Sequence, residues 1–351
     1  MSAYFHETKR WIEQGDTSSQ KMHLLTVQQI MQARNRIKNY VRRTPLEFSP
    51  FLSQRCRDSK VYIKCENLQL TGSFKIRGAF NKVCLLKEKD ANISKRGAVS
   101  ASTGNHALAC TEAMNQLGVP IRVFVPENIS SAKHERLKVN NAILTLHGQD
   151  CIFAENAARK YSEENKIPFI SPYNDTDVAA GQGTIGIEIF EDLPDVDNVL
   201  VPVGGGGLIG GIAAYLKGVN PKIKVYGCQP IQSKVMYESI KAGSIIFEES
   251  GDTLSDGTSG GIEENSVTFE LCRNYVDHWL LVEEEHIAKA IYFMLSHHHM
   301  MIEGAAGVSL GAFMTNMDQF AGQKTVIIAC GANISMEKLK KIIQMEEEKI
   351  I

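Results

Sequence analysis

The stretch Thr71–Phe80 (Thr-Gly-Ser-Phe-Lys-Ile-Arg-Gly-Ala-Phe) sets Lys75 among mostly small and apolar residues. Most lysines are solvated surface groups, so a lysine alone is a modest indicator of function. Burial would lower the pKa of Lys75, and a neutral amine can form a Schiff base with a carbonyl and later act as a base. Lys75 is therefore the candidate nucleophile.

Four consecutive glycines, Gly204–Gly207, follow the apolar residues Val201–Val203 and precede Leu208. Glycines let backbone N–H groups approach a phosphate closely, and a helix N-terminus adds a partial positive charge. A packing turn between strand and helix would need one glycine rather than four. The run lacks both the dinucleotide fingerprint and the GK[ST] ending of a triphosphate loop, so it predicts a site for the lone phosphate of a cofactor.

A third motif, Ser100–Ala107 (Ser-Ala-Ser-Thr-Gly-Asn-His-Ala), joins a predicted strand to a predicted helix. Its hydroxyl and N–H groups at a helix start can hold a substrate carboxylate. Taken alone, the motif is better explained as an ordinary N-cap by Ser102 or Thr103.

These turns need an α/β framework, and the alternation of β-branched runs with helical periodicity indicates one. Strand-to-strand crossovers through helices predict largely parallel sheets, with ligands at the carboxyl ends of strands. A second group of elements is expected to begin near Gln182. The predicted strands are 97–101, 121–125, 143–146, 198–203, 224–228 and 325–329, and the predicted helices are 105–116, 132–139, 154–164, 208–216 and 284–296.

Composition narrows the class of protein. A chain of 351 residues with 43% hydrophobic content favours two domains. The net charge of -2 argues against nucleic-acid and membrane partners, and residues Met1–Gln20 show no apolar core of a signal peptide. The eight cysteines lack paired CxxC spacing, which predicts reduced thiols and a cytoplasmic location.

In this order along one chain, the three motifs resemble the fold-type II pyridoxal-phosphate family, in its serine/threonine dehydratase and serine racemase branch. The resemblance covers roughly residues 25–340. It implies pyridoxal 5'-phosphate as cofactor and an α/β, tryptophan synthase β-like fold of two domains with largely parallel twisted sheets flanked by helices. Residues 1–96 and 175–351 would form the large cofactor-binding domain, and residues 97–174 the small α/β domain.

Carried over to matching positions, the resemblance makes Lys75 the Schiff-base lysine. Asn105 would bond the phenolic oxygen of the cofactor, and Cys330 would face its pyridine nitrogen. The other implied cofactor contacts are Phe74, Gly204, Gly205, Gly206, Gly207 and Leu208; the implied substrate-binding residues are Ser102, Thr103, Asn105 and His106, with Glu303 lining the same cavity.

The identity of residue 330 predicts the reaction. A carboxylate there would keep the pyridine nitrogen protonated, whereas the thiol of Cys330 cannot, so the ring is a weaker electron sink and β-elimination is favoured. We expect a dehydratase (ammonia-lyase) that converts L-threonine and/or L-serine to 2-oxobutanoate or pyruvate and ammonia. The loop Asp256–Glu263 is similar to one that borders the active site in relatives, and it leaves bulkier 3-hydroxy amino acids open as substrates.

Two other functions stay open. Racemases of this branch carry a serine hydroxyl at the position of Thr103, so racemisation is an alternative, although the β-branching of threonine restricts that hydroxyl. A catalytically silent binding protein is the weaker alternative, because Lys75, Asn105 and the glycine run are all present.

Metal binding and assembly complete the expectations. Where relatives bind a divalent metal through charged oxygens, this chain has Gln229 and Val235, which predicts no strong Mg²⁺ or Mn²⁺ site. His297–His299 are read as structural, because adjacent helical residues point in different directions. The resemblance implies a homodimer or homotetramer, and no isoleucine-sensing domain is expected after Asn333.

Overall fold

A computed structural model describes residues 25–349, and the expectation made for Met1–Gln20 lies outside these residues. The described elements, in chain order, are α2 (Val27–Ile37), β1 (Leu46–Phe48), α3 (Pro50–Arg55), β2 (Lys60–Lys64), η1 (Glu66–Leu68), α4 (Lys75–Lys89), α5 (Ile93–Arg96), β3 (Ala98–Ala101), α6 (Asn105–Leu117), β4 (Ile121–Val125), α7 (Ser131–Val139), β5 (Ile143–Leu146), α8 (Cys151–Asn165), α9 (Thr176–Asp192), β6 (Asn198–Pro202), α10 (Gly207–Val219), β7 (Lys224–Pro230), α11 (Val235–Ala242), α12 (Val267–Tyr275), β8 (His278–Val282), α13 (Glu284–His298), α14 (Gly304–Thr315), η2 (Met317–Phe320), β9 (Lys324–Ile328) and α15 (Met336–Glu348).

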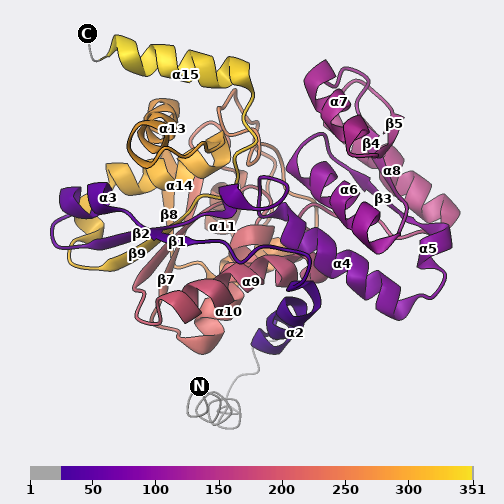
Figure 1. The fold of residues 1–351 in the computed structure, drawn as a ribbon, viewed down its shortest axis with the longest axis horizontal. Coiled ribbons are helices and arrows are strands. Elements are labelled where there is room, and N and C mark those ends of the chain that lie inside the picture. Colours follow the sequence, from indigo (N-terminus) through magenta and orange to yellow (C-terminus); the bar gives the residue numbers. More distant parts are fainter. Residues whose placement is uncertain (1–24, 350–351) are drawn as a thin grey trace.

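A six-stranded sheet, ordered β1-β2-β9-β6-β7-β8, forms the larger part of the molecule. Every neighbouring pair is parallel except β1 and β2, which are antiparallel. Helices α9 and α10 cover one face and α13 and α14 the other (Figure 1). Strand β6 is buried throughout, as a strand covered on both faces must be, and this explains its apolar sequence Asn-Val-Leu-Val-Pro.

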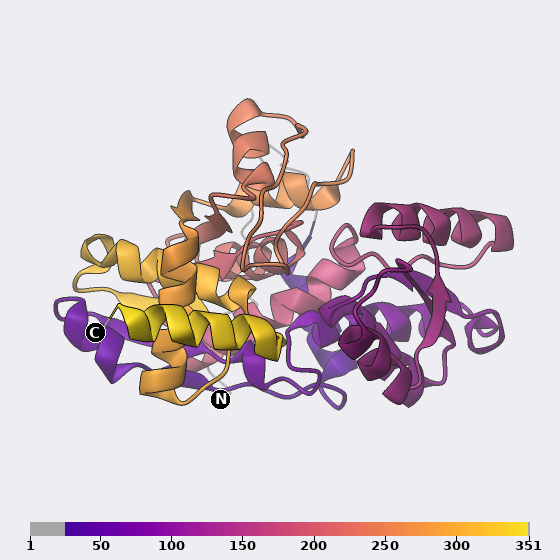
Figure 2. The same ribbon diagram turned by 90° about the horizontal axis from the view of Figure 1, so that it is seen from above.

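A separate three-stranded parallel sheet, β3-β4-β5, lies at the opposite end of the molecule with α6, α7 and α8 (Figures 1 and 2). The α/β class and the largely parallel sheets are confirmed, and each strand and helix predicted from periodicity is present with bounds shifted by a few residues. Gln182, near which the second group of elements was expected to begin, lies inside α9.

Strands β1, β2 and β8 were not predicted from the sequence. The sequence of β2, Lys-Val-Tyr-Ile-Lys, places a lysine at each end of a short apolar core. Lys64 is nevertheless fully buried, because its amine pairs with the Glu188 carboxylate at 2.6 Å. A buried charge with a partner from a distant helix leaves no trace in local periodicity.

The proposed boundary between residues 96 and 97 runs across a shared hydrophobic cluster. Buried residues of α4, including Ile76 and Phe80, pack together with Ala109 of α6 and Val123 of β4. The division into two domains therefore stays a prediction. No helix within residues 25–349 is both long enough and apolar enough to cross a membrane.

Candidate active site

Three segments that are distant in the sequence meet beside the carboxyl end of β9. The loop before α4 pairs with the turn after β9, through a bridge between Ser73 and Gly331 and through the Phe74 N–H, which donates to the Cys330 carbonyl at 3.0 Å. The N–H of Glu303, which caps α14, donates to the Gly331 carbonyl at 2.9 Å. This arrangement brings Phe74, Glu303 and Cys330 close to Lys75.

Lys75 is the first residue of α4 and is partly buried. Its Nζ donates to the Pro172 carbonyl at 2.7 Å and lies 5.2 Å from the centre of the Phe74 ring. Among residues 25–349, no carboxylate pairs with this amine. Burial lowers the pKa of Lys75 to about 8, although the nearby Cys330, Cys110 and Glu303 oppose the shift. The amine is thus prepared to lose its proton near neutral pH.

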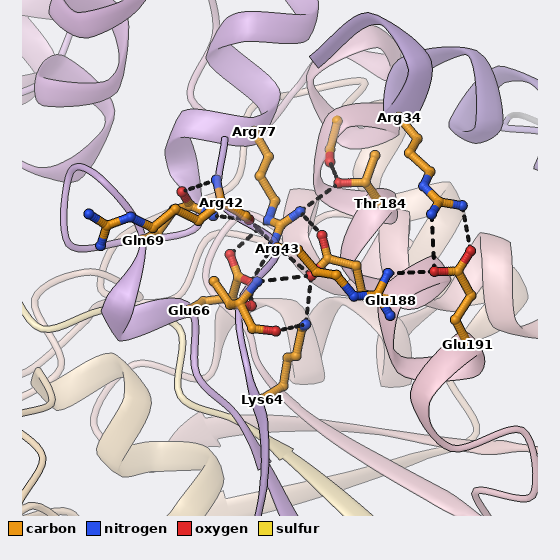
Figure 3. A network of polar contacts seen from close by, with 12 residues as sticks. Arg34, Arg42, Arg43, Lys64, Glu66, Gln69, Arg77, Thr184, Glu188 and Glu191 are labelled. Atoms are coloured by element: carbon orange, nitrogen blue, oxygen red, sulfur yellow. Dashed lines mark hydrogen bonds and ion pairs between the residues drawn. The ribbon is translucent and has the colours of Figure 1, made fainter. Parts of the chain in front are cut away.

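A buried ionic network holds α4 two residues further on (Figure 3). The Arg77 guanidinium donates to both oxygens of Glu66, at 2.7 and 2.8 Å, and to both oxygens of Glu188, at 2.6 and 3.0 Å. The amine of Lys64 donates to the same Glu188 at 2.6 Å. Two cations thus balance two carboxylates between β2, η1, α4 and α9, and the network fixes the helix that begins at Lys75.

The glycine run Gly204–Gly207 forms the turn between β6 and α10. At φ +85°, Gly206 has a backbone conformation that favours glycine, and a Cβ added to Gly205 would lie 2.3 Å from the Tyr173 ring. Within the described residues, the N–H groups from Gly204 to Leu208 donate to no protein acceptor. A cradle of free donors at a helix start fits a phosphate group. The residues present therefore fit the expected cofactor.

The loop Ser102–Asn105 forms a second group of free donors at the start of α6. In the part of the chain that the structure describes, the N–H groups of Thr103, Asn105 and His106 have no acceptor. The His106 side chain instead turns inward, where its Nε2 donates to the Ile170 carbonyl at 3.1 Å. Burial, followed by the charge of Lys75, lowers the pKa of His106 to about 3, so the ring stays neutral. Only the backbone of His106 is placed to meet a substrate.

Cys330 and Glu303 form the buried floor of the site, with the Cys330 Sγ 4.0 Å from the Glu303 carboxylate. Burial, followed by the charge of Glu303, raises the pKa of Cys330, which keeps the thiol protonated. Burial also raises the pKa of Glu303, against the bonds that Asn105 and Asn333 donate to it. Asn105 Nδ2 reaches the two Glu303 oxygens at 2.8 and 3.0 Å.

Several neighbours of the site were not predicted from the sequence. Pro172 supplies the carbonyl that accepts from Lys75, and Tyr173 packs against the glycine run while its hydroxyl accepts from the Glu263 N–H at 2.9 Å. Asn333 bonds both Glu303 and Asn105. For Tyr173, the sequence feature that could have indicated a role was an aromatic residue next to a proline just before α9. No sequence feature indicated the contacts of Asn333.

The loop Asp256–Glu263 lies against the site. A Cβ added to Gly204 would meet the Thr258 backbone at 2.9 Å, and one added to Gly257 would lie 3.7 Å from a Glu303 oxygen. These contacts place the loop beside both the glycine run and the buried floor. Its effect on substrate choice stays a prediction.

The two positions considered for metals have other contacts. The Gln229 amide donates to the Val203 carbonyl at 3.1 Å and accepts from the Tyr237 N–H at 2.8 Å. His297 stacks on Phe293 at 4.5 Å, whereas His298 Nε2 lies 2.9 Å from the Ser49 hydroxyl. The two histidines therefore do not converge. Among residues 25–349, no cluster of three or more His, Cys, Asp or Glu could hold a metal ion.

Comparisons with known proteins find matches over most of this chain. A family model described as "Pyridoxal-phosphate dependent enzyme" matches residues 37–331. An L-threonine ammonia-lyase of Thermotoga maritima is 40% identical over 320 residues, 91% of this chain and 78% of that protein.

Two solved structures are similar over most of their length. The processed form of threonine deaminase isoform 2 from Solanum lycopersicum has a TM-score of 0.86 and 28% identity, covering 94% of this chain and 95% of that one. Maize serine racemase has a TM-score of 0.84 and 29% identity, covering 93% and 99%. The overall fold is thus common to lyases and racemases, and only chemistry inside the site can separate them.

Proposed function

Because this chain belongs to the pyridoxal-phosphate dependent enzyme family, we propose that it is an ammonia-lyase that eliminates water from L-threonine, L-serine or both. The products are 2-oxobutanoate or pyruvate, with ammonia. The 40% identity to a T. maritima L-threonine ammonia-lyase supports this choice within the family.

The observation that carries the proposal is the state of Lys75. Its pKa is lowered to about 8 because the amine is buried, and the amine donates a hydrogen bond to the neutral Pro172 carbonyl. When bound, pyridoxal phosphate withdraws electrons from the α-carbon of an amino acid and so makes the α-proton removable. A neutral Lys75 amine can accept that proton, which is the role of the base in elimination.

The surrounding groups suit an amino-acid substrate. The free N–H groups at the start of α6 can bind a carboxylate, and the helix end favours its negative charge. The Cys330 thiol stays neutral because its pKa is raised, so it brings no charge to the pyridine side of the site. With an uncharged thiol as the partner that the resemblance implies for the pyridine nitrogen, departure of a β-hydroxyl is favoured over a long-lived carbanion.

Racemisation is the second candidate, because Thr103 places a hydroxyl on the same loop and the fold also matches a serine racemase. Thr103 is half-buried. Its β-branching restricts the hydroxyl, so elimination remains the preferred reaction.

The test is a paired assay of the purified chain with L-threonine and L-serine. Keto-acid release is followed while the remaining amino acid is checked for its D-enantiomer. Keto acid without D-product supports the lyase, and the faster substrate defines its preference. D-product in excess supports the racemase. If neither substrate is turned over, the assay is repeated with bulkier 3-hydroxy amino acids.

A cytoplasmic location and a homodimer or homotetramer are further parts of the proposal. All eight cysteines are free, which suits a reducing compartment. A light-scattering mass equal to the 38.9 kDa chain would contradict an oligomer.

A further inference from the structure

The side chain of Asn333 lies where four segments of the fold meet. Its Nδ2 donates to the Thr71 carbonyl at 3.0 Å and to Asn105 Oδ1 at 2.6 Å. Its Oδ1 accepts from Arg136 Nη2 at 2.8 Å, a contact that spans 197 positions in the sequence. Its backbone N–H donates to Glu303 at 3.0 Å. One residue thereby joins the loop before Lys75, the start of α6, the buried floor of the site and α7 beside the smaller sheet.

These bonds can run in only one direction. Arginine is only a donor and a backbone carbonyl is only an acceptor, so Arg136 and Thr71 together orient the Asn333 amide. Asn333 therefore donates from its NH₂ group to Asn105, and Asn105 must accept with its side-chain oxygen. The Asn105 nitrogen is then directed to the acceptor oxygens of Glu303, at 2.8 and 3.0 Å.

We propose that Asn333 is a positioning residue that fixes the amide of Asn105, and that Arg136 holds Asn333 in this orientation from α7. The proposal rests on the proposed function, in which Asn105 donates to the phenolic oxygen of the cofactor. The Asn105 nitrogen carries two hydrogens, and its two contacts go to the two oxygens of one carboxylate, which a single hydrogen can serve. The second hydrogen stays available only while the nitrogen faces the site.

A rotated Asn105 would present its carbonyl oxygen, which cannot donate to a phenolic oxygen. Leaving a polar contact unmade in a half-buried site costs more than a surface contact contributes. Asn333 is thus expected to act on cofactor binding without touching the cofactor. Arg136 is exposed on α7, so its removal tests the bond without disturbing a core.

The decisive variant is Asn333→Leu, which keeps the approximate size of the side chain but removes its amide donors and its acceptor without adding a charge beside Glu303. If Asn333 merely fills space, this variant behaves as the wild type does. If it positions Asn105, pyridoxal phosphate binds the stripped full-length protein about tenfold more weakly. Arg136→Met is expected to weaken binding about threefold, and Lys138→Met on the same helix is the matched control for loss of positive charge.

Binding is measured by titrating pyridoxal phosphate into the cofactor-free protein and following absorbance and fluorescence, with circular dichroism to verify folding. The Arg136→Met effect should vanish when Asn333→Leu is already present, because both act through one amide. Wild-type binding by Asn333→Leu, or an Arg136→Met effect of equal size in both backgrounds, overturns the positioning role alone. A wild-type protein that binds no pyridoxal phosphate overturns the proposed function as well.

Discussion

Lys75 and Arg77 are two residues apart on α4, yet they occupy opposite electrostatic environments. Burial disfavours the positive charge of both. At Arg77 the carboxylates of Glu66 and Glu188 outweigh that cost and raise the pKa (Figure 3). At Lys75 the amine donates to the neutral Pro172 carbonyl and pairs with no carboxylate of residues 25–349, so burial dominates and lowers the pKa to about 8.

The difference shows what separates a structural cation from a reactive one. Burial alone does not decide whether the pKa of a cation is raised or lowered, because the more deeply buried Arg77 has the raised pKa and the partly buried Lys75 the lowered one. The decisive factor is a counterion within hydrogen-bond distance. The Arg77 network anchors the helix, and that anchored helix presents an amine with no counterion within the described part of the chain.

The largest expected effect comes from removing the reactive amine. Lys75→Ala should reduce keto-acid release by about 10³-fold or more, because both the site of cofactor attachment and the base are lost. Initial rates at saturating substrate measure the loss. Lys89→Ala, an exposed position at the end of the same helix, should leave the rate unchanged. Full turnover by Lys75→Ala would exclude the assigned role.

Breaking the structural cation should act on stability. Arg77→Met leaves two buried carboxylates without their main partner and should lower the free energy of unfolding by about 3–5 kcal/mol. Urea unfolding measures this change. The control Arg34→Met removes an exposed pair with Glu191 and should cost less than about 1 kcal/mol. Equal losses in the two variants would mean that Arg77 gains nothing from its burial among carboxylates.

The pKa of Lys75 predicts a pH dependence of stability in the cofactor-free protein. An unfolded lysine titrates near its ordinary value of 10.5, whereas the folded amine titrates at about 8. Between these values the unfolded chain holds a proton that the folded chain has lost, so the free energy of unfolding rises with pH, by at most about 1.4 kcal/mol per unit. Below pH 8 the contribution is constant.

That dependence is measured as the difference between wild type and Lys75→Met across this pH range. Parallel profiles for the two proteins would show that the Lys75 amine is not perturbed. Peptide mass spectrometry after brief acetylation gives an independent midpoint for the same amine.

Chelation should have the smallest effect. At the position where relatives bind a metal, the Gln229 side chain is engaged by backbone atoms. EDTA is therefore expected to change neither the unfolding temperature nor turnover. Stoichiometric Mg²⁺ or Mn²⁺ found by elemental analysis would contradict this expectation.

Much of the fold could be predicted from the sequence because its signals are local. The apolar run of β6 and the glycines that follow specify a strand, a turn and a helix start within a short window. Strand β2 was missed because its buried Lys64 depends on Glu188, which is 124 positions away. Periodicity carries no information about a partner at that distance.

For the candidate site, the sequence by itself determined which chemical groups are present: an amine in an apolar stretch, a glycine cradle and a thiol at position 330. Only the tertiary structure decided their state. The Pro172 carbonyl reaches Lys75 across 97 positions, Asn333 reaches Asn105 across 228, and Arg77 meets its carboxylates through η1 and α9. Motifs arise from the backbone and neighbouring residues, whereas pKa values and amide orientations depend on which distant groups the folded chain brings within a few ångströms.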